Sequence, residues 1–189
     1  MEVQDICQLT DPEPSGEAHP FVRVFTLRDG TQAVVRPMQP EDLPAWRAML
    51  EACSPQTLWL RFECHSLPRL LADAPQWCLP KLGTQWVLVG ELLAPPKIIG
   101  EGRLCLEPHG ECGEFCVMVA DPWQRHGLGR FLTDCCLELA TALRVRRLVA
   151  EVLPENARMI ALLQSRGFGL HKDAHGQVLF AERRLDHFG

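Results

Sequence analysis

The chain is organised around the sequence Phe115-Cys-Val-Met-Val-Ala-Asp-Pro-Trp-Gln-Arg-His-Gly-Leu-Gly-Arg130. Its first six residues are apolar and too few for a globular helix, so they predict a strand. Asp121-Pro122 then turns the chain, and two glycines lead into an amphipathic pattern that predicts a helix. A glycine-bearing loop between a strand and a helix start gathers free backbone N–H groups and the positive end of the helix dipole at one point. This arrangement predicts a site for phosphate.

Length, charge and cysteine content narrow the class of protein. A chain of 189 residues fits one sizeable domain, and residues 1–20 hold little that could pack. We therefore expect a loose tail at 1–20 and a single domain over 21–189. A net charge of −5 without a basic stripe argues against a nucleic-acid partner. Apolar runs of about six residues are far short of the roughly twenty that a membrane-spanning helix needs.

Nine cysteines occur without a regular framework and without a secretory signal, so reduced thiols in the cytoplasm are expected. Four possible metal ligands do fall within twelve residues, at Cys105, His109, Cys112 and Cys116. No C-x-x-C pair occurs among them, however, and free cysteine packs as a small apolar residue. We expect packed thiols here and no metal.

Several segments indicate strands, because short apolar or alternating runs are bounded by turn-forming residues. Asp29-Gly30 is a hairpin signal between the first two strands. Three later strands with short links predict an antiparallel meander. A long helix between the strands at 114–120 and 147–153 indicates a right-handed parallel crossover. The expected strands cover residues 21–27, 32–37, 85–91, 97–106, 114–120, 147–153, 168–170 and 177–181.

Helix signals account for most of the remaining chain. Proline and acidic residues at 40–42 open one helix, and Ser54-Pro55 opens a second that reaches about Phe62. Residues 64–83 contain three prolines and predict a short helix with loops. Apolar spacing after Gly129 predicts a helix of about five turns. A final helix begins at Pro154-Glu-Asn156 and stops at Gly167. The prediction is an α+β protein with a mixed, mostly antiparallel twisted sheet, a parallel central crossover and helices on both faces.

Two glycines alone are weak evidence for a phosphate site, and two common nucleotide motifs do not match. A Rossmann fingerprint needs a third glycine where this chain has Leu132, and a meander before the loop does not suit that fold. A P-loop needs Gly-Lys-Ser/Thr after the glycines, and that sequence is absent. A different phosphate-bearing ligand is expected.

Two motifs in order resemble the GNAT acetyltransferase superfamily. Gln124-Arg-His-Gly-Leu-Gly129 after an apolar strand resembles the family's Q/R-x-x-G-x-G/A signature, and Asn156 with Arg166-Gly-Phe168 resembles its next motif. Roughly residues 27–183 can be laid onto the GNAT-type fold. Other segments resemble the bacterial Pat-type protein-lysine acetyltransferase branch, as a stand-alone catalytic domain. These segments are Leu27-Arg-Asp-Gly-Thr31, Arg36-Pro37, Pro40-Glu-Asp42, Ser54-Pro55, Arg61-Phe62, Glu114-Phe115 and Glu151-Val-Leu-Pro-Glu-Asn156.

The resemblance implies acetyl-CoA as co-substrate and direct acetyl transfer to a primary amine, most simply a protein lysine. It implies that the backbone near Val117, Met118 and Val119 pairs with the pantetheine arm like an added strand. Asn156 either bonds the cofactor or only caps a helix. The arginines and the histidine of the loop add charge or are merely solvated. The residues implied to take the pyrophosphate are Gln124, Arg125, His126, Gly127, Leu128, Gly129 and Arg130.

Transfer to lysine requires a base, because an unperturbed lysine has a pKa of about 10.4. Pat-type enzymes carry their catalytic glutamate at the position that matches Glu114. Flanking apolar residues could raise the pKa of Glu114, which suits a base that works near neutrality. The alternative is a solvated glutamate beside a hairpin turn, and Glu101 and Glu107 are then the other candidate bases.

The acid that protonates the departing thiolate is unassigned. Many GNAT enzymes use a tyrosine at the position of Leu163, and this chain has no tyrosine. Ser165, Cys64 and His65 are weak substitutes, so departure of the thiolate directly or with water is expected. Two other functions remain open: a small-molecule amine acetyltransferase and a non-catalytic acyl-CoA-binding sensor. The acceptor surface is expected within residues 54–83.

Overall fold

The computed structural model describes residues 21–78, 81, 83–108, 110–173 and 175–185, and the predicted tail at 1–20 lies outside the described residues. In the described part, eight strands form one sheet in the order β1-β2-β3-β4-β5-β6-β8-β7. The strands are β1 (Arg23–Thr26), β2 (Gln32–Pro37), β3 (Gln85–Leu93), β4 (Pro96–Leu106), β5 (Cys112–Val119), β6 (Arg147–Val152), β7 (Gly169–Lys172) and β8 (Leu179–Arg184).

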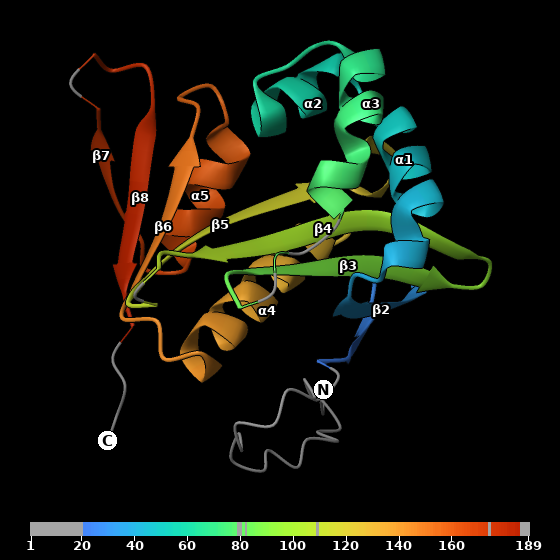
Figure 1. Cartoon of the computed structure of the whole chain (residues 1–189), viewed down its shortest axis with the longest axis horizontal. Coiled ribbons are helices and arrows are strands. Elements are labelled where there is room, and N and C mark those ends of the chain that lie inside the picture. Colours follow the sequence, from blue (N-terminus) through green and yellow to red (C-terminus); the bar gives the residue numbers. More distant parts are fainter. Residues whose placement is uncertain (1–20, 79–80, 82, 109, 174, 186–189) are drawn as a thin grey trace.

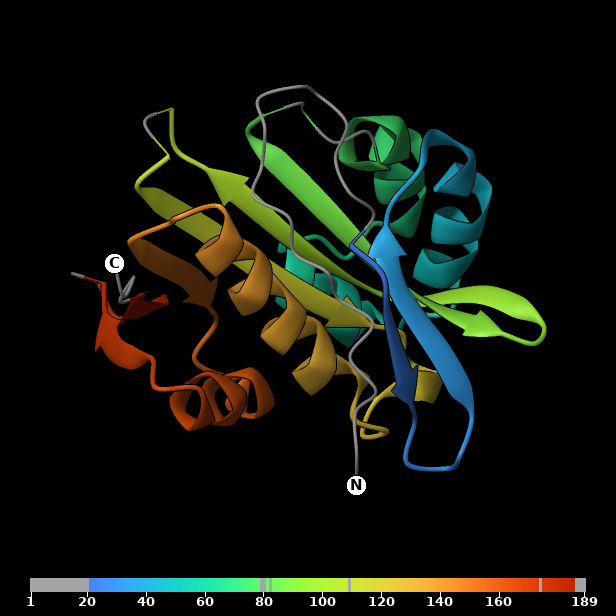
Figure 2. The ribbon, with the colours of Figure 1, turned by 90° about the horizontal axis from the view of Figure 1, so that it is seen from below.

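Helices cover both faces of the sheet. Figure 1 shows α1, α2 and α3 above it and α4 below, and Figure 2 shows α4 and α5 together on the lower face. The helices are α1 (Leu43–Glu51), α2 (Pro55–Phe62), α3 (Leu67–Cys78), α4 (Leu128–Ala142) and α5 (Ala157–Ser165), with 3-10 turns η1 (Pro40–Asp42) and η2 (Asp121–Trp123). None of the described helices combines the length and the apolar character that crossing a membrane requires.

The strand directions confirm the predicted α+β architecture. Neighbouring strands run antiparallel, including the β3-β4-β5 meander and the β1-β2 hairpin at Asp29-Gly30. The exception among the described strands is β5 and β6, which are parallel and joined through α4. The central crossover predicted from the sequence is therefore present.

Helix α4 approaches the sheet closely because β3 and β4 carry glycines beneath it. An added Cβ at Gly100 would lie 2.9 Å from the backbone oxygen of Met118 and 3.1 Å from Leu128 Cδ2. At Gly102 it would lie 2.9 Å from Cys136 Sγ. Leu128, Cys136 and their neighbours on α4 are fully buried against this surface. Small residues on the strands thus determine how closely the start of α4 packs against the sheet.

An ion-pair network joins β2 to the start of α1. Arg36 donates from Nη1 and Nη2 to Asp42 at 2.7 and 2.8 Å, and from Nε to Glu91 at 2.8 Å. Asp42 also accepts from the backbone N–H of Gln39 at 2.8 Å. Charge-assisted hydrogen bonds of this kind each stabilise a fold by about 1.5 to 3 kcal/mol. The Arg36-Pro37 and Pro40-Glu-Asp42 segments therefore have a structural role.

Two helix predictions need correction. Residues 64–83 were expected to form a short helix with loops, but α3 extends over twelve residues through Pro75. Leu70, Ala74 and Cys78 recur at helical spacing and are buried against the α1 side of the core, so packing overrides the helix-breaking residue. Helix α4 has fifteen residues, about four turns rather than five.

The cysteine-rich segment shows no metal site in the described residues, where no group of three His, Cys, Asp or Glu side chains could hold an ion. Cys112 is buried, whereas Cys105 and Cys116 are half-buried, and all three are free thiols. His109 lies outside the described residues.

Gly100→Ala should destabilise the chain by about 1 to 3 kcal/mol, because the added methyl group meets a backbone oxygen and two α4 side chains. Urea unfolding measures this difference. The matched control is Gly169→Ala on β7, where the nearest atom to an added Cβ is the Glu182 oxygen at 3.8 Å. Equal stability losses in the two variants would contradict the close approach of α4.

Candidate active site

Strands β5 and β6 pair only over their first residues and then separate. They pair at Cys112–Arg147, Gly113–Leu148 and Glu114–Val149. Beyond Glu114, β5 continues to Val119 and β6 to Val152 with no pairing between them in the described part of the chain. Figure 1 shows the two strands diverging from their common start. The sheet therefore has an open edge in its middle.

The backbone groups on this open edge can be assigned from the register with β4. Ala120 donates its N–H to Ile99 at 3.0 Å, and Val119 is opposite Gly100. In an antiparallel ladder, alternate residues direct both N–H and C=O towards the partner strand, and the residues between them direct these groups away. Val117 and Val119 therefore present their backbone groups to the opening. Met118, which is opposite Glu101, directs its groups towards β4.

The loop from Arg125 to Arg130 presents a run of free donors next to this edge. No described acceptor takes a hydrogen bond from the N–H groups of residues 125–130, and helix α4 begins at Leu128 without a side-chain cap. The carbonyl groups of Arg125 and His126 face the β1-β2 turn, where they accept from Arg28 Nη1 at 3.2 Å and Arg28 N at 3.1 Å. With its carbonyls engaged on one side, the loop leaves its N–H groups for an anion.

Two residues of this loop have left-handed backbone conformations. Arg125 has φ +68° and Gly127 has φ +97°. This backbone angle favours glycine, and a Cβ at Gly127 would also lie 3.1 Å from the ring of Phe25, which would have to shift slightly. At Arg125 the same conformation costs about 1 to 2 kcal/mol. Such strain is typical of functional loops.

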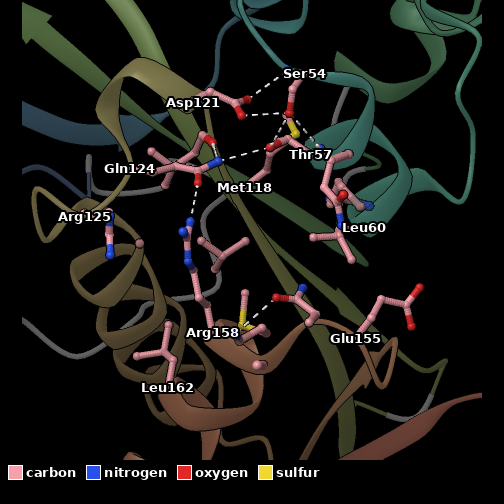
Figure 3. A pocket seen from close by; sticks show the side chains of 18 residues that line it. Ser54, Thr57, Leu60, Met118, Asp121, Gln124, Arg125, Glu155, Arg158 and Leu162 are labelled. Carbon is pink, nitrogen blue, oxygen red and sulfur yellow. Dashed lines mark hydrogen bonds between the residues drawn. The ribbon is translucent and has the colours of Figure 1, made fainter.

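A cavity of about 710 Å³ lies between the open edge, α2 and α5. Its volume suits a ligand larger than a simple metabolite. The walls come from segments far apart in the sequence, and Figure 3 shows their side chains converging on one space. The lining residues are Ser54, Gln56, Thr57, Leu60, Arg61, Val117, Met118, Val119, Asp121, Gln124, Arg125, Gly129, Glu155, Asn156, Ala157, Arg158, Met159 and Leu162.

Hydrogen bonds join the three walls of the cavity (Figure 3). Asp121 accepts from the backbone N–H and the hydroxyl of Ser54 at 2.8 and 2.7 Å, which anchors the start of α2 to the end of β5. Gln124 donates from Nε2 to Thr57 Oγ1 and to the Val119 carbonyl, both at 3.1 Å. Arg158 on α5 donates to Gln124 Oε1 at 2.9 Å. Gln124 is therefore the centre at which loop, α2 and α5 meet.

A smaller chamber of about 60 Å³ lies where β5 and β6 separate, and we call it the vertex chamber. It shares several lining residues with the larger cavity, so the two spaces adjoin. Its lining residues are Leu60, Arg61, Phe115, Cys116, Val117, Ala150, Glu151, Val152, Asn156 and Met159.

Glu114 lies at the separation point, because it forms the last residue pair with β6. The residue is exposed, but desolvation by the protein atoms around it raises the pKa of its carboxyl above the ordinary value. The Glu151 carboxylate raises this pKa further, and Arg61 opposes the change. Glu114 is thus an exposed carboxylate with increased proton affinity. It lines neither the cavity nor the vertex chamber, although the next residue, Phe115, lines the chamber.

The two other candidate bases are placed differently. Glu101 is fully buried and accepts from Trp46 Nε1 at 2.7 Å, from Arg61 at 3.2 Å and from Arg103 at 3.5 Å. Burial alone raises its pKa, but the two arginines and the Trp46 hydrogen bond outweigh burial and lower the pKa below the ordinary value. Glu107 follows the end of β4, away from the open edge. Neither has the environment of a base at the chamber.

Some of the predicted loop residues line the cavity, and others face other parts of the fold. Gln124, Arg125 and Gly129 line the cavity. The backbone N–H of Gln124 donates to the Asp121 carbonyl at 3.2 Å, and its side chain bonds Thr57, Val119 and Arg158, so this residue braces the walls of the cavity. His126 faces Asp29, with Nδ1 and Oδ2 3.4 Å apart. Leu128 is buried in the core, while Arg130 is exposed.

Asn156 and Leu163 on α5 have clear structural roles. Asn156 caps the helix by accepting from Met159 N at 3.2 Å, and it also lines both cavities. Leu163, at the position where the family tyrosine was considered, is fully buried in the core on the α4 side. Ser165, Cys64 and His65 are absent from the lining of the two cavities, and His65 stacks on Trp59.

Several cavity residues were missed by the sequence reasoning. Ser54, the cap of α2, was expected as a helix start, as part of the family resemblance and within the acceptor surface at 54–83, but not as a partner of the loop. Thr57 on α2 and Arg158 on α5 were not singled out. Their proximity to the loop comes from sheet topology and helix packing rather than from local pattern. The Ser54-Pro55 capping signal was the available indication that this helix start matters.

Known proteins share this fold. The acetyltransferase (GNAT) family model matches residues 45–168. The GNAT domain of S. lividans PAT is 23% identical, with a TM-score of 0.78, over 87% of this chain and 97% of that one. An acetyltransferase from Thermus thermophilus is 22% identical, with a TM-score of 0.62, over 81% and 97% of the two chains. At such identities the structural likeness shows the fold alone.

A longer protein shares the same fold over part of its length. The cAMP-binding acyltransferase from Mycobacterium smegmatis is 21% identical, with a TM-score of 0.59, over 89% of this chain. The match covers 48% of that protein, so this chain corresponds to about half of it.

Glu151→Gln should lower the pKa of Glu114, because it removes the neighbouring negative charge while leaving the burial unchanged. Carbon-13 NMR titration of the Glu114 carboxyl measures the effect. Glu155→Gln, which removes an equal charge just before Asn156, is the control and should leave the pKa unchanged. A Glu114 pKa that responds to neither variant would contradict the coupling.

Proposed function

The chain belongs to the acetyltransferase (GNAT) family, whose members use acetyl-CoA as co-substrate, and we propose that it acetylates lysine side chains of proteins in the manner of the Pat-type branch. The observation that carries the proposal is the open edge of β5 beside a loop of free N–H groups, with Glu114 where the strands separate. A ligand with amide groups at one end and a diphosphate at the other matches these features in order.

The pantetheine arm would complete the sheet. Its amide groups can pair with the backbone groups that Val117 and Val119 present to the opening, in the way that an added strand pairs with a sheet edge. The Val119 carbonyl already accepts from Gln124, so the remaining groups on this edge are the ones available. Unpaired backbone groups in a partly buried cleft favour such a partner.

The pyrophosphate would occupy the loop. Residues 125–130 offer consecutive N–H groups at the positive end of α4, and Gly129 lets the main chain come close to the phosphate oxygens. Arg125 and Arg158 line the same space and supply positive charge. The proposed binding residues are Val117, Met118, Val119, Gln124, Arg125, His126, Gly127, Leu128, Gly129, Arg130 and Asn156.

Glu114 would act as the general base. Its raised pKa brings it closer to neutrality, where a base accepts a proton from an ammonium group most effectively. The amine then attacks the thioester carbonyl carbon, and CoA leaves as a thiolate. With Leu163 buried and no tyrosine in the chain, the thiolate takes its proton from water.

An acidic rim supports a cationic acceptor. Glu155 lines the cavity, Glu151 lines the vertex chamber, and the exposed Glu114 is close enough to Glu151 for their charges to interact, so an incoming ammonium group is attracted to the site. We further propose a single domain over residues 21–189 that acts in the cytoplasm. The described cysteines support this compartment, because all of them are free thiols.

A test of the acceptor class combines purified chain and acetyl-CoA with lysine-bearing protein substrates and with polyamines and amino acids, and follows release of free CoA thiol. Faster turnover with protein lysines is expected. Faster turnover with small amines would make the chain a small-molecule acetyltransferase. Tight binding of acetyl-CoA without turnover on any acceptor would make it an acyl-CoA sensor.

Gly129→Leu should weaken CoA binding by about tenfold or more, because the side chain enters the cavity beside Val119 where the cofactor is expected. Calorimetric titration with CoA measures the affinity. Gly129→Ala is the control, since its Cβ meets only Val119 Cγ2 at an ordinary 3.6 Å and alanine favours a helix. Unchanged affinity in the leucine variant, with folding intact, would show that the cofactor lies elsewhere.

Glu114→Gln should lower kcat at pH 7 by about 10²- to 10⁴-fold, because the base is lost. Activity should recover as the pH approaches about 10.4, where lysine loses its own proton. Steady-state rates across pH measure both effects, and Glu107→Gln is the control that should retain the rate. A Glu114→Gln enzyme with the original pH profile would remove this residue from the mechanism.

A further inference from the structure

Arg61 on α2 is held by a buried group of charges beneath the site. Its Nη2 lies 3.2 Å from Glu101 Oε1, and its side chain is only 12% exposed. Arg103 shares the same carboxylate at 3.5 Å and is 3% exposed. Glu101 itself is 0% exposed. Two buried guanidinium groups thus share one buried carboxylate, so this group carries an excess positive charge.

The hydrogen bonds of the two arginines are also incomplete. Arg61 Nε, Arg103 Nε and Arg103 Nη1 are buried and have no acceptor among the described residues. Buried donors of this kind cost free energy unless a partner is found. Cys116 lies close to Arg61, but burial raises the pKa of its thiol to about 11, so at neutral pH the thiol is uncharged and does not neutralise the excess charge.

Of these two arginines, Arg61 alone reaches the ligand space in the described structure. It lines both the main cavity and the vertex chamber, whereas Arg103 lines neither. Arg103 is instead covered by α3, where it donates to the carbonyl of Trp77. The excess charge therefore faces the chamber through Arg61.

The proposed cofactor position brings the thioester to this chamber. A pantetheine arm that starts at the loop and follows the open edge from Val119 towards Phe115 covers four residue steps, or about 13 Å at the rise of a strand. Its sulfur end then arrives beside Phe115 and Val117, which line the vertex chamber together with Arg61. The acyl group, at the far end of the arm, enters the chamber.

We propose that Arg61 donates a hydrogen bond to the thioester carbonyl oxygen and stabilises the negative charge that develops on it. This inference rests on the proposed function. As the amine nitrogen bonds to the carbonyl carbon, the C=O π electrons move to the carbonyl oxygen, which faces the Arg61 guanidinium. Their return expels the thiolate and breaks the C–S bond. Glu114 already holds the proton taken from the ammonium group, so the excess proton on the newly bonded nitrogen passes through water to the thiolate. A fixed, desolvated cation at the developing oxyanion lowers the barrier without needing to reorganise.

Arg61→Gln and Arg103→Gln form a matched pair, because each removes one of the two cations that share Glu101 and only the first alters the chamber. The probes are acetyl-CoA with a synthetic peptide that carries a single lysine, for kcat, and CoA alone, for affinity. Arg61→Gln should lower kcat by about 100-fold or more and leave the CoA dissociation constant within about threefold, since CoA has no acyl carbonyl. Arg103→Gln should retain kcat within a few-fold.

Arg61→Lys keeps a cation beside Glu101, so it tests the role of Arg61 even if Arg61→Gln fails to fold. Its ammonium is shorter and lacks the guanidinium fork, so kcat should fall by about tenfold. Equal kcat losses in Arg61→Gln and Arg103→Gln, or an unchanged kcat in Arg61→Lys, would overturn the role of Arg61. An unaltered chain that binds no acetyl-CoA would overturn the proposed function and this inference together.

Discussion

The separation of β5 from β6 after three residue pairs is the constraint on which the rest of the site depends. A strand in the middle of a sheet normally has both edges satisfied, and here Val117 and Val119 direct their backbone groups into a cleft. Such groups need either water or a strand-like partner. The covering helices α2 and α5 form the walls of this cleft, and the hydrogen bonds through Gln124 and Asp121 keep them in place.

The conformation of the loop at residues 125–130 depends on contacts that lie behind it. Arg28 on the β1-β2 turn donates hydrogen bonds to the carbonyl oxygens of Arg125 and His126, and Phe25 packs on Gly127. Glycines on β4 let α4 approach the sheet, which fixes the position of the helix start. A peripheral hairpin and a set of strand glycines thereby orient N–H groups that would otherwise be free to rotate. The fold therefore sets the direction of these N–H groups.

Local signals in the sequence were sufficient for the architecture and for the loop. The apolar run at 115–120, the Asp29-Gly30 turn and the caps at Ser54 and Asn156 each correspond to an observed element. The walls of the cavity could not be foreseen, because Thr57 and Arg158 meet Gln124 only through the tertiary arrangement of three helices and a strand. Helix α3 was underestimated because burial against α1 outweighs the local effect of Pro75. The burial of Glu101 between two arginines likewise depends on contacts far apart in the sequence.

The central claim is that coenzyme A completes the sheet at the open edge of β5 and places its diphosphate on the loop. Amide hydrogen exchange with and without CoA tests this most directly, because it reports on individual N–H groups. The account predicts slower exchange on CoA binding at Val117, Val119 and residues 125–130, with little change on β1 or β7. CoA binding that leaves these amides unprotected, or that protects amides elsewhere, would contradict it.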